Sequence, residues 1–483
     1  MKKTIRIITM LIILVTVSCD DYLEVLPNGQ ENTENYFNSA EDYESALVGV
    51  YDLLSTTYLN QILGEIASDN SLCGGENPTD VLDWQQIDDM THNPDNGALR
   101  NIFQWMYAGI SRANYIMEFK DKTPFARKAQ VLAETKFLRS YYYFELVKFF
   151  GSVPMYLDKR ITIEETQSID KSSTAEIYAQ LEKDLEDAAD VLPWQQSQSG
   201  RVTKGAALAL LGKVYLYQNK YAEAAAAFDQ VINSGQYNLV SDFASIFSNQ
   251  NENNSESVFE VQYFGQEGAS FDCFQCVEGN IAVGFMGPRF RTGNYAPYAD
   301  GFSFNIPSLA IVNAFETGDL RRNATYFNIN DFVATRPDVT FSEGHDHNGY
   351  FNFKYIPYAE GNALDQRLTH SNNYRAIRYA DVLLMAAEAH VQDGNTGIAQ
   401  NYLDMIRDRA FGNTNNRIPA TLSNILQERR LELAGEGHRF FDQVRTGETS
   451  TIPGFTPNKN ELFPLPRIEI ELAGNRWAQN TGY

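Results

Sequence analysis

Apolar and small residues recur at helical spacing in two segments of the chain, 201–239 and 379–410. Within each segment the apolar positions repeat three and four residues apart, and a second run of the same kind follows after the same interval. Residues at this spacing share one face of a helix. Each segment is therefore predicted to form two antiparallel helices that pack along an apolar stripe.

The order of residue types in both segments resembles the tetratricopeptide pattern, in which one repeat is a pair of helices. Gly212 and Ala224 are small enough to let two helices approach closely, and Phe228 would fill the space beside them. The matching positions are Leu208, Leu211, Gly212, Tyr215, Ala224 and Phe228 in the first segment, and Leu383, Ala386, Ala387, His390, Ala399 and Leu403 in the second.

Two further helix pairs are predicted from weaker patterns, near 126–191 and near 421–445. In the first, a long apolar helix ending near residue 149 precedes an amphipathic helix that stops before Pro193. Stacking of several such units stabilises them. Long stretches separate the four units, so the chain is not expected to form a free solenoid.

The stretch 250–368 is different, because it is rich in glycine, asparagine, aspartate and aromatic residues and includes the run FSFNIP at 302–307. Residues 258–263 alternate between apolar and polar, as in a short strand. We expect loops and small hairpins here and a second loop-like stretch at 68–99. Long irregular loops in compact proteins tend to carry function.

The N-terminus reads as an export signal. Lys2 and Lys3 precede an apolar run at 7–17, which is too short to span a bilayer, and Cys19 follows the small residue Ser18. This arrangement predicts a lipoprotein signal peptide at 1–18 and a lipid on Cys19, with a mature domain at 19–483. The alternative is an ordinary secreted protein whose signal contains a cysteine.

The chain has 39 basic and 62 acidic residues and a formal net charge of −23. Nucleic-acid binding requires lysine and arginine to displace counterions, so that function is excluded. With so many carboxylates, a pair at glycosidase spacing would be expected by chance and is no sign of catalysis. None of the usual nucleophile, phosphate-binding or zinc-protease motifs is found.

Two other groups of reactive residues are interpreted as structural. Cys273 and Cys276 have no second cysteine pair for zinc, so a local disulfide or two idle thiols are expected. The two histidines of 345–347 also have no evident fourth ligand. The charged block 428–445 is expected to be a network that locks two helices together, since Glu428 and Glu432 share a helix face.

Many ordered blocks along the chain resemble the SusD/RagB family, the nutrient-binding outer-membrane lipoproteins of Bacteroidetes. The most specific blocks are ERRLEL at 428–433 and GHRFFD at 437–442. The other blocks lie at 19–24, 33–37, 46–51, 133–139, 151–154, 200–204, 378–384, 463–466 and 479–483.

The resemblance implies a mainly α fold, in which four tetratricopeptide-like helix pairs support an irregular, loop-rich ligand-binding half. It also implies a lipoprotein on the outer-membrane surface that captures oligosaccharides. The partner would be a SusC-like TonB-dependent transporter, for which the protein acts as a lid. Family members are not enzymes, and neither a cofactor nor a metal is expected.

Candidate ligand-binding residues are loop aromatics with polar neighbours, because sugar rings lie against flat aromatic side chains while amides, carboxylates and guanidinium groups bind their hydroxyls. A neutral glucan is the preferred ligand. Peptide binding on the same scaffold, and a protein-interaction role for the helical repeats, remain alternatives. The candidates are Trp84, Asp83, Asn70, Asp69, Phe290, Arg291, Tyr295 and Tyr298.

Overall fold

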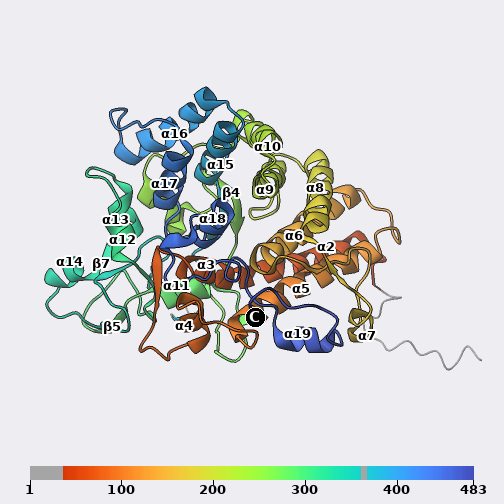
Figure 1. The fold of residues 1–483 in the computed structure, drawn as a ribbon, viewed down its shortest axis with the longest axis horizontal. Helices are drawn as coiled ribbons and strands as arrows, with labels where there is room; N and C mark the ends of the chain where they lie inside the picture. The colour runs from red at the N-terminus through yellow and green to blue at the C-terminus, as the bar shows by residue number, and fades with distance from the viewer. Residues whose placement is uncertain (1–35, 360–366) are drawn as a thin grey trace, which may run out of the picture.

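The computed structural model describes residues 36–359 and 367–483 (Figure 1). The predicted signal peptide and the predicted lipidation site Cys19 lie outside the described residues. Within these two ranges, no helix combines the length and the apolar character needed to cross a membrane.

Long helices form most of the molecule, as the sequence predicts. Figure 1 shows them in an arc across the top and right of the view. They are α2 (Ala40–Asp52), α5 (Gly97–Glu118), α6 (Lys128–Phe150), α8 (Thr174–Val191), α9 (Lys204–Tyr217), α10 (Tyr221–Asn233), α15 (Tyr379–Gln392), α16 (Thr396–Phe411), α17 (Leu422–Glu432) and α18 (Arg439–Thr446).

Shorter helices and turns connect this arc to the rest of the chain. The short α-helices are α3 (Tyr58–Ile66), α4 (Leu82–Asp88), α7 (Ile163–Thr166), α11 (Ile281–Met286), α12 (Leu309–Val312), α13 (Arg321–Thr325), α14 (Ile329–Ala334) and α19 (Arg467–Leu472). The 3₁₀ turns are η2 (Leu53–Thr57), η3 (Phe243–Phe247), η4 (Asn249–Asn251), η5 (Phe274–Cys276) and η6 (Thr449–Thr451).

The predicted helix pairs form and stack. Helix α6 packs on α8, α9 on α10 and α15 on α16, while α8 meets α9 and α10 meets α15, so that each pair contacts the next. A Cβ atom on Gly212 would lie 2.5 Å from the ring of Phe228, which confirms the close approach that the small residue permits. The fourth unit also forms two helices, but α17 packs chiefly on α15 and α18 on α3.

Local capping fixes where these helices begin. Ser39 before α2 and Ser173 before α8 each form a capping box, in which the serine side chain accepts from the third backbone N–H and the third side chain accepts in return. Such caps satisfy N–H groups that have no partner within the helix. The apolar faces of the repeat helices are covered by packing, since Phe228 and Leu403 are fully buried.

The loop-rich half contains short antiparallel strand pairs, and the teal segment at the left of Figure 1 carries several of them. Among the described residues, three of the five pairs join strands far apart in the sequence, and these three are not the local hairpins that the sequence predicted. The pairs are β1 (Ser71–Gly74) with β6 (Phe304–Pro307), β2 (Val153–Pro154) with β3 (Lys171–Ser172), β4 (Ser257–Val261) with β10 (Tyr374–Arg378), β5 (Arg289–Thr292) with β8 (Thr340–Ser342), and β7 (Tyr326–Asn328) with β9 (Tyr350–Asn352).

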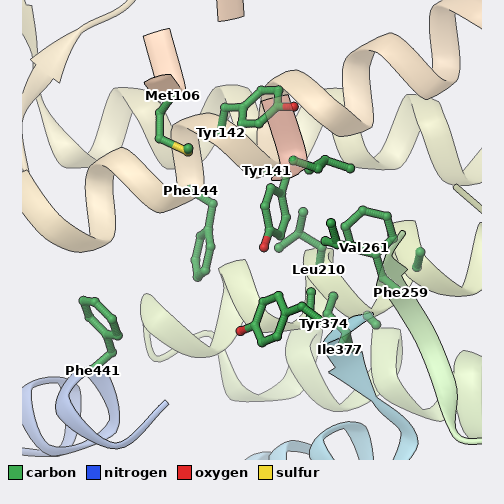
Figure 2. Close-up of a cluster of buried hydrophobic side chains, with 14 of the residues drawn as sticks. Met106, Tyr141, Tyr142, Phe144, Leu210, Phe259, Val261, Tyr374, Ile377 and Phe441 are labelled. Carbon is green, nitrogen blue, oxygen red and sulfur yellow. The ribbon is translucent and has the colours of Figure 1, made fainter. Parts of the chain in front are cut away.

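The main apolar core lies between the helices and the β4–β10 pair. Figure 2 shows Tyr141 and Phe144 of α6 pointing toward Leu210 of α9 and toward Tyr374 of β10. Polar ends of buried rings find partners, since the hydroxyl of Tyr142 donates to the backbone carbonyl of Val50 at 2.6 Å. One continuous core therefore joins the repeat helices to the strand that enters α15.

A second kind of contact holds the repeats together: a buried cluster of charges that we call the charge hub. Arg378 donates to Glu436 at 2.8 Å and to Glu432 at 3.0 Å, and Arg321 donates to Glu432 at 3.0 Å. Burial alone would raise the pKa of Glu432, but the surrounding arginines hold it well below its usual value. The hub consists of Glu256, Arg321, Lys354, Arg378, Arg409, Glu432 and Glu436.

The charged network predicted for 428–445 is confirmed, and it reaches further than two helices. Arg429 of α17 pairs with Asp442 of α18 at 3.0 Å and with Asp381 of α15. Arg321 belongs to α13, and Arg378 ends β10. The network therefore joins three long helices to the loop-rich half.

Candidate functional site

A cavity of about 500 Å³ opens in the loop-rich half beside α4. Aromatic side chains and charged groups share its lining, and they come from seven separate stretches of the chain. The lining residues are Tyr58, Leu59, Glu76, Asp80, Val81, Asp83, Trp84, Ala98, Asn101, Phe271, Phe274, Phe285, Arg289, Arg291, Phe302, Phe304 and Arg367. We call this cavity the aromatic pocket.

The floor of the aromatic pocket is made of buried rings. The ring of Trp84 lies 4.8 Å from that of Phe285 and 5.1 Å from that of Phe304, centroid to centroid. All three residues are buried, so these rings hold one another in fixed orientations. Trp84 is thus part of a packed floor and does not stand free as a platform.

The lip of the pocket is aromatic as well, and a disulfide fixes it. Cys273 and Cys276 are joined, which closes a turn around Phe274, whose ring lies 5.9 Å from that of Phe271. The side chain of Phe271 is 59% exposed, although its ring also reaches Phe302 at 5.8 Å. Phe271, Phe274 and Phe302 gather their rings at the mouth of a cavity, and clustered apolar surface of this kind marks a candidate contact surface.

Charged groups at the rim are paired and oriented. Arg289 donates to Asp80 at 3.0 Å, and the guanidinium of Arg367 lies 3.9 Å from the centroid of the Phe302 ring while pairing with Asp300 at 3.3 Å. The guanidinium of Arg291 donates to the hydroxyl of Ser342 at 2.7 Å. An arginine carries five N–H donors, so such a group keeps further donors for a ligand.

The local backbone explains how the floor and rim come together. Gly75 has a φ of +94°, and a Cβ atom there would lie 2.8 Å from the Phe304 ring, so only glycine lets the chain pass this close. The side chain of Gln85 donates to the carbonyl of Gly74 at 2.7 Å, which ties α4 to β1. The pairing of β1 with β6 then brings Phe304 over Trp84.

The structure brings three of the predicted site residues together: Trp84, Asp83 and Arg291 all line the aromatic pocket. The cavity wall is formed by side chains of both rim and floor. Flat apolar faces next to oriented N–H donors and carboxylates suit a ligand that has apolar faces and many hydroxyl groups.

Three predicted aromatics lie in a separate small core outside this lining. Phe290 is buried and stacks on Tyr295, with ring centroids 4.6 Å apart. Tyr298 packs against Phe327 at 5.0 Å, and burial raises its pKa to about 12. Their contacts are those of packing residues that support strand β5, which carries Arg289 and Arg291.

Asp69 and Asn70, which the sequence predicts as rim groups, also lie outside the lining of the pocket. Asp69 accepts from Arg439 at 2.8 Å, and Asn70 accepts from Arg430 at 2.7 Å. These arginines and a hydrogen bond from Thr451 hold the pKa of Asp69 below its usual value, against the raising effect of burial. Both side chains are thus engaged in tying β1 to α17 and α18.

Sequence reasoning missed most of the lining aromatics. Phe302 and Phe304 carried a usable signal, because residues two apart in a strand point to the same side. The disulfide-closed turn carried another, since it constrains Phe274. Arg367 gave no signal, because its role depends on a neighbour far away in the chain. The missed residues are Phe271, Phe274, Phe285, Arg289, Phe302, Phe304 and Arg367.

Metal ligation has no visible basis in the part of the chain that the structure describes. No group of three or more histidine, cysteine, aspartate or glutamate side chains is arranged there to hold an ion. His345 lies 3.4 Å from Asp346, and the ring of His347 packs between Phe341 and Phe351. These histidines make ordinary surface and packing contacts.

Comparisons with known proteins give one consistent picture. Residues 21–216 match the family described as "Starch-binding associating with outer membrane", and residues 313–463 match the SusD family. The SusD-like protein P2 of Formosa agariphila is 28% identical over 535 residues, covering 100% of both chains.

Solved structures agree with these matches. A laminarin binding SusD-like protein is 32% identical, with a TM-score of 0.83, and the match covers 92% of this chain and 99% of that one. Surface glycan-binding protein A from Bacteroides thetaiotaomicron, in complex with laminarihexaose, is 26% identical, with a TM-score of 0.83 and coverage of 91% and 99%. The helical fold predicted from the sequence is confirmed.

Proposed function

The chain belongs to the SusD family, and on that premise we propose that it captures oligosaccharides at the cell surface and passes them to a SusC-like TonB-dependent transporter. In this role it binds ligand without converting it and acts as a lid on the transporter. The observation that carries the proposal is the aromatic pocket with its oriented rim.

The chemistry of the pocket fits a pyranose chain. The C–H faces of sugar rings would lie against the exposed ring of Phe271 and the edge of Phe302, where burial of apolar area favours binding. Their hydroxyls would accept from Arg289 and Arg367 and donate to Asp83. Because such sites are shallow and partly wet, ordered water would complete these hydrogen bonds.

A neutral glucan of the laminarin type is the proposed cargo. Arg289 is paired with Asp80 and Arg367 with Asp300, and the lining carries as many carboxylates as arginines, so the pocket has no net positive charge to attract an anionic sugar. The chain's formal charge of −23 further disfavours anionic polymers. The two laminarin-related structures named above support the same ligand class.

The test is isothermal titration of the full chain carrying Cys19→Ala, so that no lipid is attached. The titrants are laminarihexaose, a maltohexaose, an anionic oligogalacturonate and an unstructured neutral peptide. Saturable heat with laminarihexaose alone is expected. Binding of the peptide in its place would favour the peptide-binding alternative, and binding of the anionic sugar would refute the argument from charge.

Anchoring and partnership are proposed from the N-terminal sequence and the family. A lipid on Cys19 would hold the protein at the outer membrane, and a SusC-like transporter would bind it there. Cell fractionation tests the anchor, because Cys19→Ala should move the protein out of the membrane fraction. Copurification with a barrel-forming protein from the native cells tests the partnership.

A further inference from the structure

A second hollow lies on both sides of the loop that joins α8 to α9. One cavity of about 490 Å³ and another of about 280 Å³ share the same dividing residues, among them Gln198, Gly200 and Glu260. Several side-chain amides line the walls near this loop, together with Trp194 in the smaller cavity and Val48 in the larger one. We call the combined hollow the amide trough, defined by Val48, Trp194, Gln195, Gln198, Gln236, Asn253 and Gln262.

Charged groups beside the dividing loop are neutralised by partners. Arg201 pairs with Glu44 at 2.8 Å and with Glu134 at 3.2 Å. Glu260 accepts from the backbone N–H of Asn253 at 3.0 Å and from the side chain of Asn373 at 2.9 Å. The carboxylates of Asp52, Glu260 and Glu278 also line the hollow, and Arg201 is already paired, so the trough offers amide, hydroxyl and carboxylate groups, which suit a partner rich in hydroxyl groups.

The amides are held in position before any ligand arrives. Asn253 and Gln262 donate to each other's side-chain oxygens at 2.9 and 3.0 Å, and Gln195 donates to Gln236 at 2.9 Å. An amide oxygen accepts two hydrogen bonds, so each of these pairs keeps acceptor capacity. Preorganised groups lose less conformational entropy on binding than free side chains do.

Trp194 adds a flat apolar surface to this polar wall. The residue is half-buried, and the ammonium of Lys204 lies 5.9 Å from the centroid of its ring. A ring that borders a row of amides repeats the combination found in the aromatic pocket, with amides in place of paired charges.

The two hollows adjoin each other. Tyr58 and Phe274 line the aromatic pocket, whereas Leu54 and Ser55, one turn earlier in the chain, line the trough. The η2 turn that carries Leu54 and Ser55 packs directly against the disulfide-closed η5 turn. A polymer leaving the aromatic pocket past the disulfide would therefore meet the near end of the trough.

We propose that the amide trough is a second glycan-binding site, which takes a further stretch of the neutral polysaccharide held in the aromatic pocket. The proposal rests on the proposed function, since it assumes the same cargo. With two sites, the protein would bind long polysaccharides more tightly than short ones, because the second contact forms within the same complex.

A peptide added to the edge of β4 fits this hollow less well. The side chain of Gln262 already donates to the backbone carbonyl of Glu260 at 2.8 Å, which occupies an acceptor that an added strand would use. The dividing loop also crowds that end, because a Cβ atom on Gly200 would lie 2.4 Å from Gln262. Backbone pairing along β4 is thus obstructed where the strand ends.

The test is titration of the full chain (Cys19→Ala) with laminarihexaose and with polymeric laminarin. Two hexaoses per chain are expected for the native chain and one for Trp194→Ala, whereas Phe271→Ala should keep both sites and weaken one of them about tenfold. The polymer should bind at least about tenfold more tightly than the hexaose, and Trp194→Ala should abolish this difference. The double variant Gln195→Ala/Gln198→Ala, at two exposed positions, should act in the same direction without any risk to the fold.

Several outcomes would overturn the proposal. One hexaose per chain, bound more weakly in Phe271→Ala and unchanged in both trough variants, would leave the aromatic pocket as the binding site and refute the trough. Binding of the unstructured peptide that is lost in Trp194→Ala would reassign the trough to peptides. A native chain that binds neither sugar would refute the proposed function together with this inference.

Discussion

The charge hub and the aromatic pocket differ in the side chains that form them and in how far these side chains are exposed. In the hub, arginines and glutamates are buried between regular helices and satisfy one another, as Arg378 does with Glu432 and Glu436. In the pocket, uncharged rings stand on irregular backbone and Phe271 faces the solvent. Buried charge holds the fold together in the hub, whereas the pocket combines ring faces with charged groups at its rim. A count of acidic residues therefore says nothing about catalysis here.

The largest effect should come from breaking the hub. Arg378→Ala would remove a buried arginine that pairs with Glu256, Glu432 and Glu436 alike, and would leave excess negative charge in a buried site. Removing one member of a buried ion pair typically costs about 3–5 kcal/mol of unfolding free energy. Urea denaturation followed by circular dichroism measures this cost, and the change does not touch the rings of the aromatic pocket.

The matched control is Arg417→Ala. Arg417 pairs with Asp408 at 2.8 Å on the exposed side of α16, where water and salt screen the attraction. No measurable change in unfolding free energy is expected. Equal destabilisation by both variants would show that burial is not what makes the hub strong.

The next prediction concerns the pH dependence of stability that a buried carboxyl group beside the hub should cause. Glu65 of α3 accepts from the backbone N–H groups of Gly435 and Gly437, both at 2.9 Å, and burial raises its pKa from 4.5 to about 7. A raised carboxyl pKa means that the folded state binds the proton more tightly than the unfolded state. Its stabilising contribution is therefore present at low pH and is lost as the pH rises from about 4.5 to about 7.

Glu65→Gln isolates this contribution, because glutamine stays neutral at every pH. The unfolding free energy of the native chain, minus that of the variant, should fall by about 3 kcal/mol between pH 5 and pH 8. Glu432 has the opposite sign, since its lowered pKa gives stability that is lost on acidification. A difference that stays flat with pH would mean that Glu65 is ionised throughout.

How far the sequence could predict each region follows from the range of its contacts. The helix pairs are local: Gly212 meets Phe228 sixteen positions later in the chain, so spacing alone reveals them. The pocket depends on distant pairings, because β1 meets β6 more than two hundred residues away and places Phe304 over Trp84. A pattern confined to one segment cannot anticipate such a pairing.

The role of the predicted rim residues also depends on contacts with distant parts of the chain. Asp69 and Asn70 look like free loop polar groups in the sequence, but their partners Arg439 and Arg430 lie at the opposite end of the chain. Trp84 could be found because acid and amide neighbours mark it within its own segment. Its burial could not be predicted, since Phe285 and Phe304 cover it from elsewhere.

A smaller effect, on ligand affinity and not on stability, is expected when a ring at the lip of the aromatic pocket is removed. Phe271→Ala removes a ring that is 59% exposed and should weaken laminarihexaose binding about tenfold, or about 1.4 kcal/mol, at an unchanged melting temperature. Phe264→Ala is the control, because Phe264 is 53% exposed but does not line the pocket. Equal losses in both would point to a general surface effect.

The smallest expected effect concerns the disulfide that fixes the lip. Opening Cys273–Cys276 with a dithiol, which transfers two electrons and two protons to the pair, leaves every ring in place but frees the turn around Phe274. Ordering a freed side chain on binding costs about 0.5–1.5 kcal/mol, so the affinity for laminarihexaose should fall about threefold. The double variant Cys273→Ser/Cys276→Ser should show the same loss and no response to the dithiol.

This last measurement shows whether the disulfide holds the lip of the pocket in a fixed arrangement, as ion pairs hold the charge hub. In the hub, buried charges hold one another in a fixed arrangement, and in the pocket the disulfide would hold the lip by covalent means. If reduction leaves the affinity unchanged, the contacts of Phe271 with Phe302 and of Phe274 with Phe285 hold the lip without the disulfide. If it lowers the affinity more than Phe271→Ala does, the turn positions more of the pocket than its own two rings.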